Sequence, residues 1–327
     1  MGAKLILDCD TGVDDAVAIV YAALHPDIEL LAVGTVWGNV DVELATRNTL
    51  RVLDIAGRPE VPVAPGAAGP LRGTPAVFST EVHGADGQGG AGDDEPVREA
   101  APTTAAQQIV DLVRAHPGEV WLVPVGPLTN IAAALALDPE LPKLVAGVSV
   151  MGGSAGAPGN VTPVAEANIW HDPEAAAEVF RAPWPIVMAG LDVTMGAVIT
   201  AEHRDRLAAS GAAGRYLAGI LQHYGEFYRA NVFGEWACCM HDTIAVAAAA
   251  GTLGVRLAPL VNVEIDTTDG PGRGQTVADL RGVHRGYPDQ PGAHCRVLLE
   301  IDTRIVDEVV ELIARHRGAA EGVGAIR

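Results

Sequence analysis

Four carboxylates crowd into eight positions near the start of the chain, directly behind an apolar run. The stretch LILDCDTGVDDAVAIV holds Asp8, Asp10, Asp14 and Asp15. Two carboxylates about 4 Å apart repel each other by roughly 4 kcal/mol at an effective dielectric constant near 20. A helix N-terminus offsets only about 0.3–1 kcal/mol for each acidic residue. A bound cation removes this conflict, and an irregular shell of oxygen ligands without His or Cys favours calcium over magnesium.

Further polar residues follow apolar runs elsewhere in the chain. Asn39 comes after ELLAVGT, GPLTN follows EVWLVPV, and the long loop after GVSVMG carries Asn160, Glu166 and Asn168. In open α/β sheets, ligands bind beyond the carboxyl ends of the strands. We therefore expect these side chains to converge with the acidic cluster on one crevice.

The apolar runs themselves are short and rich in Val, Ile and Leu, which is typical of parallel strands buried on both faces. They alternate with segments of helical spacing at 14–24, 41–56, 103–115, 129–137 and 173–181. This alternation predicts an α/β fold with an open, mostly parallel, doubly wound sheet and helices on both faces. A one-sided apolar pattern in TRIVDEVVELIARH predicts a helix near the end of the chain.

Length and composition favour one domain. The chain has 327 residues, 49% of them hydrophobic, and its Gly/Pro-rich stretches at 64–74 and 84–93 do not resemble flexible linkers. We expect a single domain over residues 1–327, with inserted active-site loops at about 76–94 and 213–240.

Charge and targeting signals exclude several classes of partner. The formal net charge of −19 disfavours nucleic-acid polymers and anionic lipid surfaces. No apolar run approaches the roughly 20 residues of a membrane span, and no secretory signal is visible, so we expect a cytoplasmic protein. The spacing of Cys9, Cys238, Cys239 and Cys295 fits neither a disulfide framework nor a zinc site, which predicts reduced thiols.

The opening DCDTG also resembles the D-x-D start of aspartyl-phosphate phosphatases, in which the first Asp is a nucleophile. Such an enzyme needs a later Lys to hold the phosphate. The chain has only Lys4, inside the first predicted strand, and Lys143. This interpretation is therefore weaker than a calcium site that serves another reaction.

Eight motifs occur in order between residue 5 and about residue 246. They are DCDTGVDDAVAI, GTVWGNV, VHGADGQGG, VPVGPLTNIA, VMGG, GNVTPVAEANIWHDPEAA, GLDVT and MHDTIAV. Together they resemble the inosine-uridine preferring nucleoside hydrolase family. The resemblance implies a Ca²⁺-dependent ribonucleoside hydrolase that assembles as a homodimer or homotetramer.

The resemblance also implies roles for the acidic residues. Asp10, both oxygens of Asp15, Asp242 and the main-chain carbonyl of Val125 would ligate Ca²⁺. The family usually has Thr where this chain has Val125, but a carbonyl ligand survives that change. Asp10 would also take a proton from a metal-bound water, which is the nucleophile.

The ribose contacts follow in the same way. The resemblance places Asp14, Asn168 and Asp242 on the 2′- and 3′-hydroxyls, and Asn160 and Glu166 on the 5′-hydroxyl. Two more residues are expected nearby, Asn39 and Met151.

Base contacts are less well defined. His241 would help to protonate the departing base, His83 would lie in a glycine-rich flap over the site, and Tyr224 or Tyr228 would touch the base. Their structural alternatives are a helix start, a surface loop and core packing. His241 replaces the Trp typical of purine-selective members, which favours the inosine-uridine-like branch without settling the preferred base.

The chemistry of the residues agrees with these roles. N-glycosidic cleavage passes through an oxocarbenium-like ribosyl cation, so negative charge around the sugar and an activated water favour it. A non-catalytic ribose or nucleoside binder that keeps the metal site is the alternative. The presence of Asp10 and His241 favours catalysis, because binding alone requires no base beside the metal.

Overall fold

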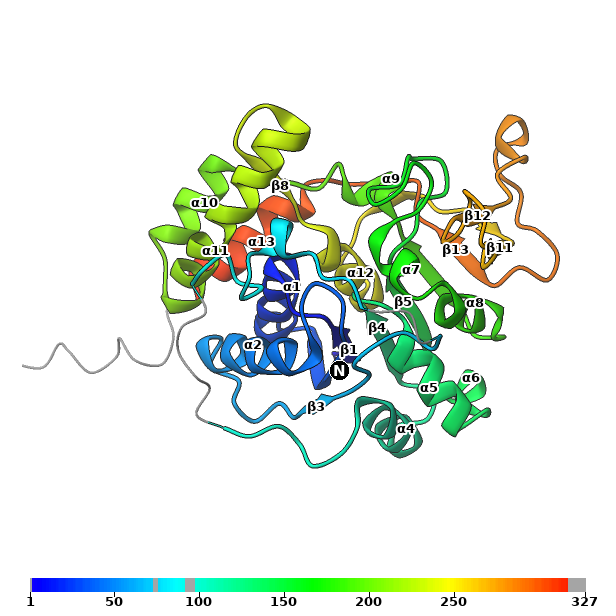
Figure 1. Cartoon of the computed structure of the whole chain (residues 1–327), viewed down its shortest axis with the longest axis horizontal. Helices are drawn as coiled ribbons and strands as arrows, with labels where there is room; N and C mark the ends of the chain where they lie inside the picture. The colour runs from blue at the N-terminus through cyan, green and yellow to red at the C-terminus, as the bar shows by residue number, and fades with distance from the viewer. Residues whose placement is uncertain (1, 73–75, 92–97, 317–327) are drawn as a thin grey trace, which may run out of the picture.

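The computed structural model describes residues 2–72, 76–91 and 98–316. At its centre is an eight-stranded sheet in the order β10-β13-β6-β5-β4-β1-β2-β3, and only the β10–β13 pair is antiparallel. The predicted fold class, a mostly parallel sheet with helices around it, is confirmed (Figure 1). The strands are β1 (Ala3–Cys9), β2 (Ile28–Thr35), β3 (Val63–Pro65), β4 (Val120–Pro124), β5 (Gly147–Met151), β6 (Ile186–Ala189), β10 (Leu260–Val261) and β13 (Cys295–Val297).

Two hydrophobic clusters cover the two faces of this sheet. In β1, Leu5 and Leu7 belong to one cluster and Ile6 to the other, because successive side chains of a strand point to opposite faces. The first cluster includes residues of α1 (Val13–Leu24), α2 (Val42–Ile55), α11 (Ala212–Tyr228), α12 (His241–Ala250) and α13 (Ile305–Arg315). The second includes residues of α4 (Ala105–Ala115), α5 (Thr129–Leu137), α6 (Leu141–Leu144), α7 (Ala167–His171) and α8 (Pro173–Arg181).

Local sequence signals explain where several helices begin and end. The side chain of Asp41 accepts a hydrogen bond from the Leu44 N–H and caps α2. Asp172 caps α8 in the same way, and Pro173 occupies the first helical position, where its missing N–H costs nothing. Gly251 ends α12 in the left-handed region, with φ of 72°. None of the described helices has the length and apolar character needed to cross a membrane.

Smaller elements complete the described chain. Three two-stranded sheets pair β7 (Val198–Thr200) with β8 (Ala237–Cys239), β9 (Val255–Leu257) with β14 (Glu300–Ile301), and β11 (Val263–Ile265) with β12 (Thr276–Ala278). The short helices are α3 (Thr80–His83), α9 (Leu191–Thr194), α10 (Ala201–Ala208), a π-helical turn (Arg229–Phe233) and a 3₁₀ turn (Val283–Arg285).

The two expected insertions take different forms. Segment 213–240 is mostly helical, because α11 and the π-helical turn occupy it before β8 begins. Segment 76–94 contains α3, and its residues 92–94 lie outside the described residues. All four cysteines are buried and free, as their spacing predicted.

The strand order reverses at β1. From β1 the chain continues outward to β2 and β3, whereas β4 pairs with the opposite edge of β1. Such a switch point leaves a crevice outside the carboxyl ends of the two central strands, which is the usual ligand position in open α/β sheets. Asp10 follows β1 and Val125 follows β4, so both lie at this crevice.

Candidate active site

The acidic cluster is built at the junction of β1 and α1. Asp10 is 1% exposed and Asp15 is fully buried. The Gly12 N–H donates to Asp15 Oδ2 at 2.8 Å, and the Asn39 N–H donates to Asp10 Oδ2 at 2.7 Å. A side chain at Gly38 would collide with Asp10 Oδ2, so glycine is required at that close approach. The backbone therefore fixes one oxygen of each carboxylate.

The second oxygen of each of these two carboxylates indicates a metal site. Asp10 Oδ1 and Asp15 Oδ1 are buried and have no hydrogen-bond partner. One oxygen each of Asp14, Asp15 and Asp242 lie within 4.8 Å of one another. Buried carboxylate oxygens without donors are costly unless a cation compensates them, and an all-oxygen donor set suits a hard divalent ion. The residues present thus fit the predicted metal.

Electrostatics lead to the same conclusion. Burial and the neighbouring charge of Asp15 raise the pKa of Asp14 to about 8. Burial raises the pKa of Asp15 to about 6, although the Gly12 N–H opposes the shift. Burial and nearby carboxylates also hold the pKa values of Asp10 and Asp242 well above their ordinary range. Without a cation the cluster favours bound protons, and a divalent ion can take their place.

Asp8 lies apart from this group. Its Oδ1 accepts a hydrogen bond from Asn130 Nδ2 at 2.8 Å, and its buried Oδ2 has no partner. Burial raises the pKa of Asp8 to about 7. The structure therefore separates one of the four N-terminal carboxylates from the other three.

The loop between β5 and α7 supplies the opposite wall of the site. Glu166 accepts hydrogen bonds from the N–H groups of Gly153, Asn168 and Ile169. Burial raises the pKa of Glu166 to about 7, against the effect of these donors. Asn160 is exposed and accepts from the N–H of Ala167 at 3.0 Å, which holds it at the rim.

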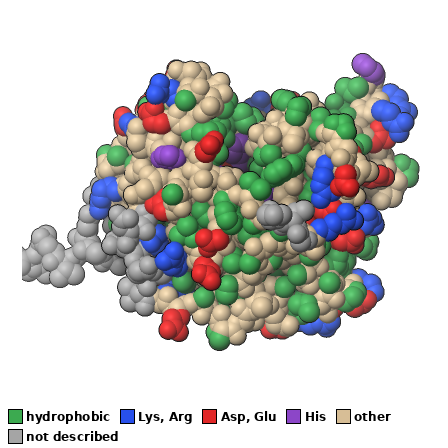
Figure 2. All heavy atoms as spheres, viewed as in Figure 1, with side chains coloured by type: hydrophobic (Ala, Val, Ile, Leu, Met, Phe, Trp, Pro, Cys, Tyr) green, Lys and Arg blue, Asp and Glu red, His purple; other side chains and the backbone are tan. Residues whose placement is uncertain are grey.

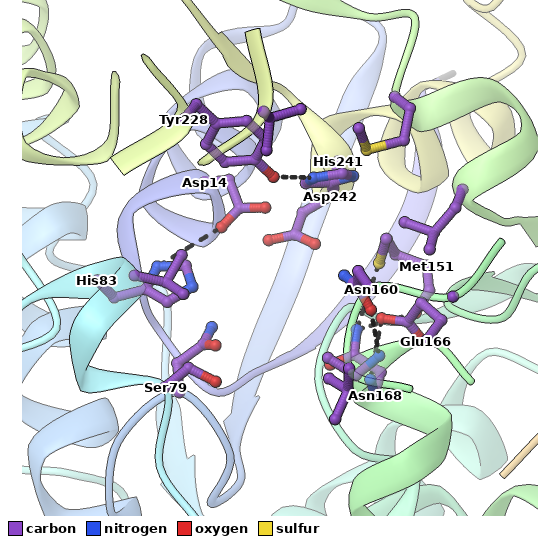
Figure 3. Close-up of a pocket in the computed structure, with 18 of the residues that line it drawn as sticks. Asp14, Ser79, His83, Met151, Asn160, Glu166, Asn168, Tyr228, His241 and Asp242 are labelled. Carbon is purple, nitrogen blue, oxygen red and sulfur yellow. Dashed lines mark hydrogen bonds and ion pairs between the residues drawn. The ribbon is translucent and has the colours of Figure 1, made fainter. Parts of the chain in front are cut away.

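Asn168 connects this wall to the metal-binding side. Its amide nitrogen donates to the carbonyl oxygens of Val125 at 2.9 Å and Met151 at 3.1 Å. Figure 3 shows Asn160, Glu166 and Asn168 across the pocket from Asp14 and His83. Polar groups from two sides thus face a common space, as the sequence predicted.

His241 is held at both ring nitrogens. Its Nε2 lies 2.7 Å from the Tyr228 hydroxyl (Figure 3). Its Nδ1 lies 2.8 Å from the hydroxyl of Thr194. Burial lowers the pKa of His241 to about 4, so the ring is neutral at pH 7. A neutral imidazole between two hydroxyls can pass a proton from one hydroxyl to the other. Sequence reasoning missed Thr194, although it ends the GLDVT motif.

His83 is buried rather than exposed in a surface loop. Its Nδ1 accepts from the Val13 N–H at 3.1 Å and lies 3.9 Å from Asp14 Oδ1. The ring stacks on Tyr224 with centroids 5.2 Å apart. Burial lowers the pKa of His83 to about 3, so it too is neutral. α3 thereby packs directly on the N-terminus of α1.

Most of these groups line one cavity of about 710 Å³. Figure 2 shows the corresponding hollow, with histidine visible inside it. The predicted site residues that line the cavity are Asp14, Asn39, His83, Val125, Met151, Asn160, Glu166, Asn168, Tyr224, Tyr228, His241 and Asp242. Asp10 and Asp15 do not line it, but both accept hydrogen bonds from Asn39, which does.

Other lining residues escaped the sequence analysis as site residues. They are Ser79, Val82, Ala157, Pro158, Gly159, Val161, Ala167, Leu191, Asp192, Met195, Phe227, Asn231 and Val232. Most are apolar or lie on α11 and its π-helical extension, where helical periodicity alone indicates core packing. Asp192 belongs to the GLDVT motif, which was the available signal. None of the described residues around the cavity is Lys or Arg.

Comparisons with known proteins agree with this geometry. The family model described as inosine-uridine preferring nucleoside hydrolase matches residues 5–308. The chain is 36% identical to a pyrimidine-specific ribonucleoside hydrolase RihA of Enterobacter sp. (strain 638) over 96% of this chain and 99% of that protein. It is 39% identical to an inosine-uridine preferring nucleoside hydrolase of Crithidia fasciculata, over 92% and 94% of the two chains. A solved purine-preferring ribonucleoside hydrolase from Gardnerella vaginalis superposes with a TM-score of 0.87 at 34% identity, covering 95% and 98% of the chains.

Proposed function

Because this chain belongs to the inosine-uridine preferring nucleoside hydrolase family, we propose that it is a calcium-dependent enzyme that hydrolyses ribonucleosides to free base and ribose. The predicted family is confirmed, and with it the assignment as an N-glycosyl hydrolase that acts on small nucleosides. The metal, the mechanism and the individual residue roles form the proposal. The observation that carries them is the set of buried, unpartnered carboxylate oxygens beside a cavity walled by amide side chains.

Asp10, Asp15, Asp242 and the carbonyl of Val125 would hold the calcium ion. The unpartnered Asp10 Oδ1 and Asp15 Oδ1 support this assignment, since each needs a positively charged neighbour. When bound, the ion would lower the pKa of a nearby water and balance the charge of the cluster.

Asp10 would accept the proton of the attacking water. Its Oδ2 accepts the Asn39 N–H, which orients the carboxylate, and the remaining lone pair of Oδ2 would take the proton while Oδ1 faces the ion. Asp14, Asn168 and Asp242 would hold the 2′- and 3′-hydroxyls, and the negative charge around the sugar would stabilise the ribosyl cation that forms.

The 5′-hydroxyl would bind between Asn160 and Glu166. An amide and a carboxyl group offer complementary donors and acceptors to a hydroxyl. His241 would deliver a proton to the departing base, with Tyr228 and Thr194 supplying its hydrogen-bonded partners.

The test is release of reducing sugar from uridine, cytidine, inosine, adenosine and guanosine. The calcium-loaded protein should hydrolyse at least one of them, and Asp10→Asn should lower kcat by about 10²–10⁴-fold through loss of the base. Asp41→Asn, which changes the exposed α2 cap outside the cavity, is the matched control and should keep full activity. Binding of nucleosides without any sugar release would instead favour the non-catalytic binder.

The names of the relatives above specify different bases. The substrate panel therefore also measures which base this enzyme prefers. The cytoplasmic location and the homodimer or homotetramer stay predictions.

A further inference from the structure

Three consecutive backbone N–H groups in the loop after β5 point at one carboxylate. Ala155 donates to Asp192 Oδ2 at 2.8 Å, and Gly156 and Ala157 donate to Asp192 Oδ1 at 2.7 and 2.9 Å. Successive N–H groups that converge in this way form a concave anion-binding nest, a feature that commonly holds phosphate groups. In this protein the nest is filled by a side chain of the chain itself.

The nest lies beside the residues proposed to hold the 5′-hydroxyl. The Gly153 N–H donates to Glu166 Oε2 at 2.8 Å, and the Gly153 carbonyl accepts from the Leu191 N–H at 2.9 Å. One glycine thus joins the start of the nest loop, Glu166 and the residue before Asp192. Ala157 and Asp192 both line the cavity, together with Asn160 from the same loop.

Asp192 adds negative charge to a cavity wall without cationic side chains among its described residues. No Lys or Arg is present among the described lining residues, so an anion on this wall depends on neutral donors such as the three convergent N–H groups. Asp192 already uses them, and its partly exposed carboxylate presents negative charge to the cavity. A phosphate at the 5′ position would find its donors taken and a like charge beside it.

We propose that Asp192 is a specificity-determining residue: it occupies a nest of three backbone N–H groups and thereby makes the site select 5′-hydroxyl ribosides against 5′-phosphorylated ones. The inference rests on the proposed ribonucleoside hydrolysis, because it assumes that the sugar 5′ end faces Asn160 and Glu166. It names a repulsive element as the source of selectivity, in addition to the contacts made with the correct substrate.

The test compares wild type, Asp192→Asn and Asp192→Ala. kcat/KM is measured for uridine and uridine 5′-monophosphate, and inhibition constants are measured for ribose and ribose 5-phosphate. Wild type should strongly prefer uridine. Asp192→Ala frees all three N–H groups, so the ratio of kcat/KM for the monophosphate to that for uridine should rise by at least about tenfold. Ribose 5-phosphate should gain affinity relative to ribose by a similar factor.

Asp192→Asn keeps one acceptor oxygen for the loop and removes the charge, so its ratio should lie between those of wild type and Asp192→Ala. Asp266→Ala is the matched control. Asp266 also accepts a backbone N–H, from Thr268 at 2.8 Å, but it does not line the cavity. Its ratio should equal that of wild type.

If the folded variants Asp192→Asn and Asp192→Ala keep the wild-type ratio of kcat/KM for the monophosphate to that for uridine, the inference is overturned. Equal losses of kcat/KM on both substrates are one such result, and they would indicate a purely structural role. If wild type hydrolyses no nucleoside, the proposed function fails. Calorimetric binding of ribose and ribose 5-phosphate would then still decide the role of Asp192.

Discussion

His241 is the single side chain whose role changes most between its sequence context and its surroundings in the fold. In the sequence it opens a helix beside an acidic residue, a pattern typical of helix capping. In the structure both ring nitrogens lie within hydrogen-bond distance of hydroxyls, from Tyr228 and Thr194. The ring is also buried and neutral. These contacts suit a side chain that passes a proton to the departing nucleobase, and they do not cap the helix.

His241→Ala therefore tests leaving-group activation at the residue scale. kcat/KM for uridine should fall by about 10²–10³-fold, because the departing base loses its acid. For 4-nitrophenyl riboside the loss should stay below about tenfold, since a nitrophenolate departs without protonation. Steady-state kinetics on both substrates provide the measurement.

His203→Ala is the control for this pair of substrates, because His203 pairs with Asp307 away from the cavity. It should leave both rates unchanged. Equal losses on the two substrates in His241→Ala would contradict a role as leaving-group acid.

Among the secondary-structure elements, the N-terminus of α5 ties the central strands together. Asn130 Nδ2 donates to Asp8 Oδ1 at 2.8 Å and to the Thr35 carbonyl at 2.9 Å. Its Oδ1 accepts from the Ala67 N–H at 2.8 Å. One buried amide thus joins the ends of β1 and β2 to the loop that follows β3. These are the strand ends that position the acidic cluster.

Asn130→Ala should lower the free energy of unfolding by about 2–3 kcal/mol, because it leaves buried polar groups without partners. Urea titration measures the change. Asn262→Ala is the control, since Asn262 is exposed and its side chain bonds to Gln290 at the surface, and it should cost less than about 0.5 kcal/mol. Equal costs for the two variants would show that the buried amide does not tie the strands together.

At the scale of the whole molecule, folding gathers negative charge that the unfolded chain would keep apart. Asp14 and Asp15 come from the start of α1, whereas Asp242 comes from α12, and all three are buried together. The resulting repulsion is a cost of folding that a bound divalent ion offsets. Metal binding and global stability should therefore be linked.

Calcium at about 100 times its Kd should stabilise the protein by about 2.7 kcal/mol, and a chelator should remove this increment. Thermal unfolding with and without calcium measures it. Asp15→Asn should lose most of the increment, while Asp41→Asn at the surface should retain it. A midpoint temperature that is the same with calcium and with chelator in the wild type would rule out the linkage.

Local patterns predicted the major elements closely. The expected helices at 129–137 and 173–181 coincide with α5 and α8, and the first expected strand lies within β1. The short strands β3, β10 and β13 were missed, because two or three residues carry too little periodicity to be recognised. Such segments become strands only by pairing with neighbours that the tertiary fold supplies.

Motifs that directly follow apolar runs were enough to predict the class of fold and the family, and they supplied the residues that we propose for the metal and the ribose. Only the tertiary structure decided which distant groups meet. Thr194 and His241 are 47 residues apart, and Asp8 and Asn130 are 122 apart. Contacts across such separations depend on strand order and helix packing, which no local spacing encodes. The same holds for Asp192, whose carboxylate finds its three N–H partners only when the loops after β5 and β6 lie side by side.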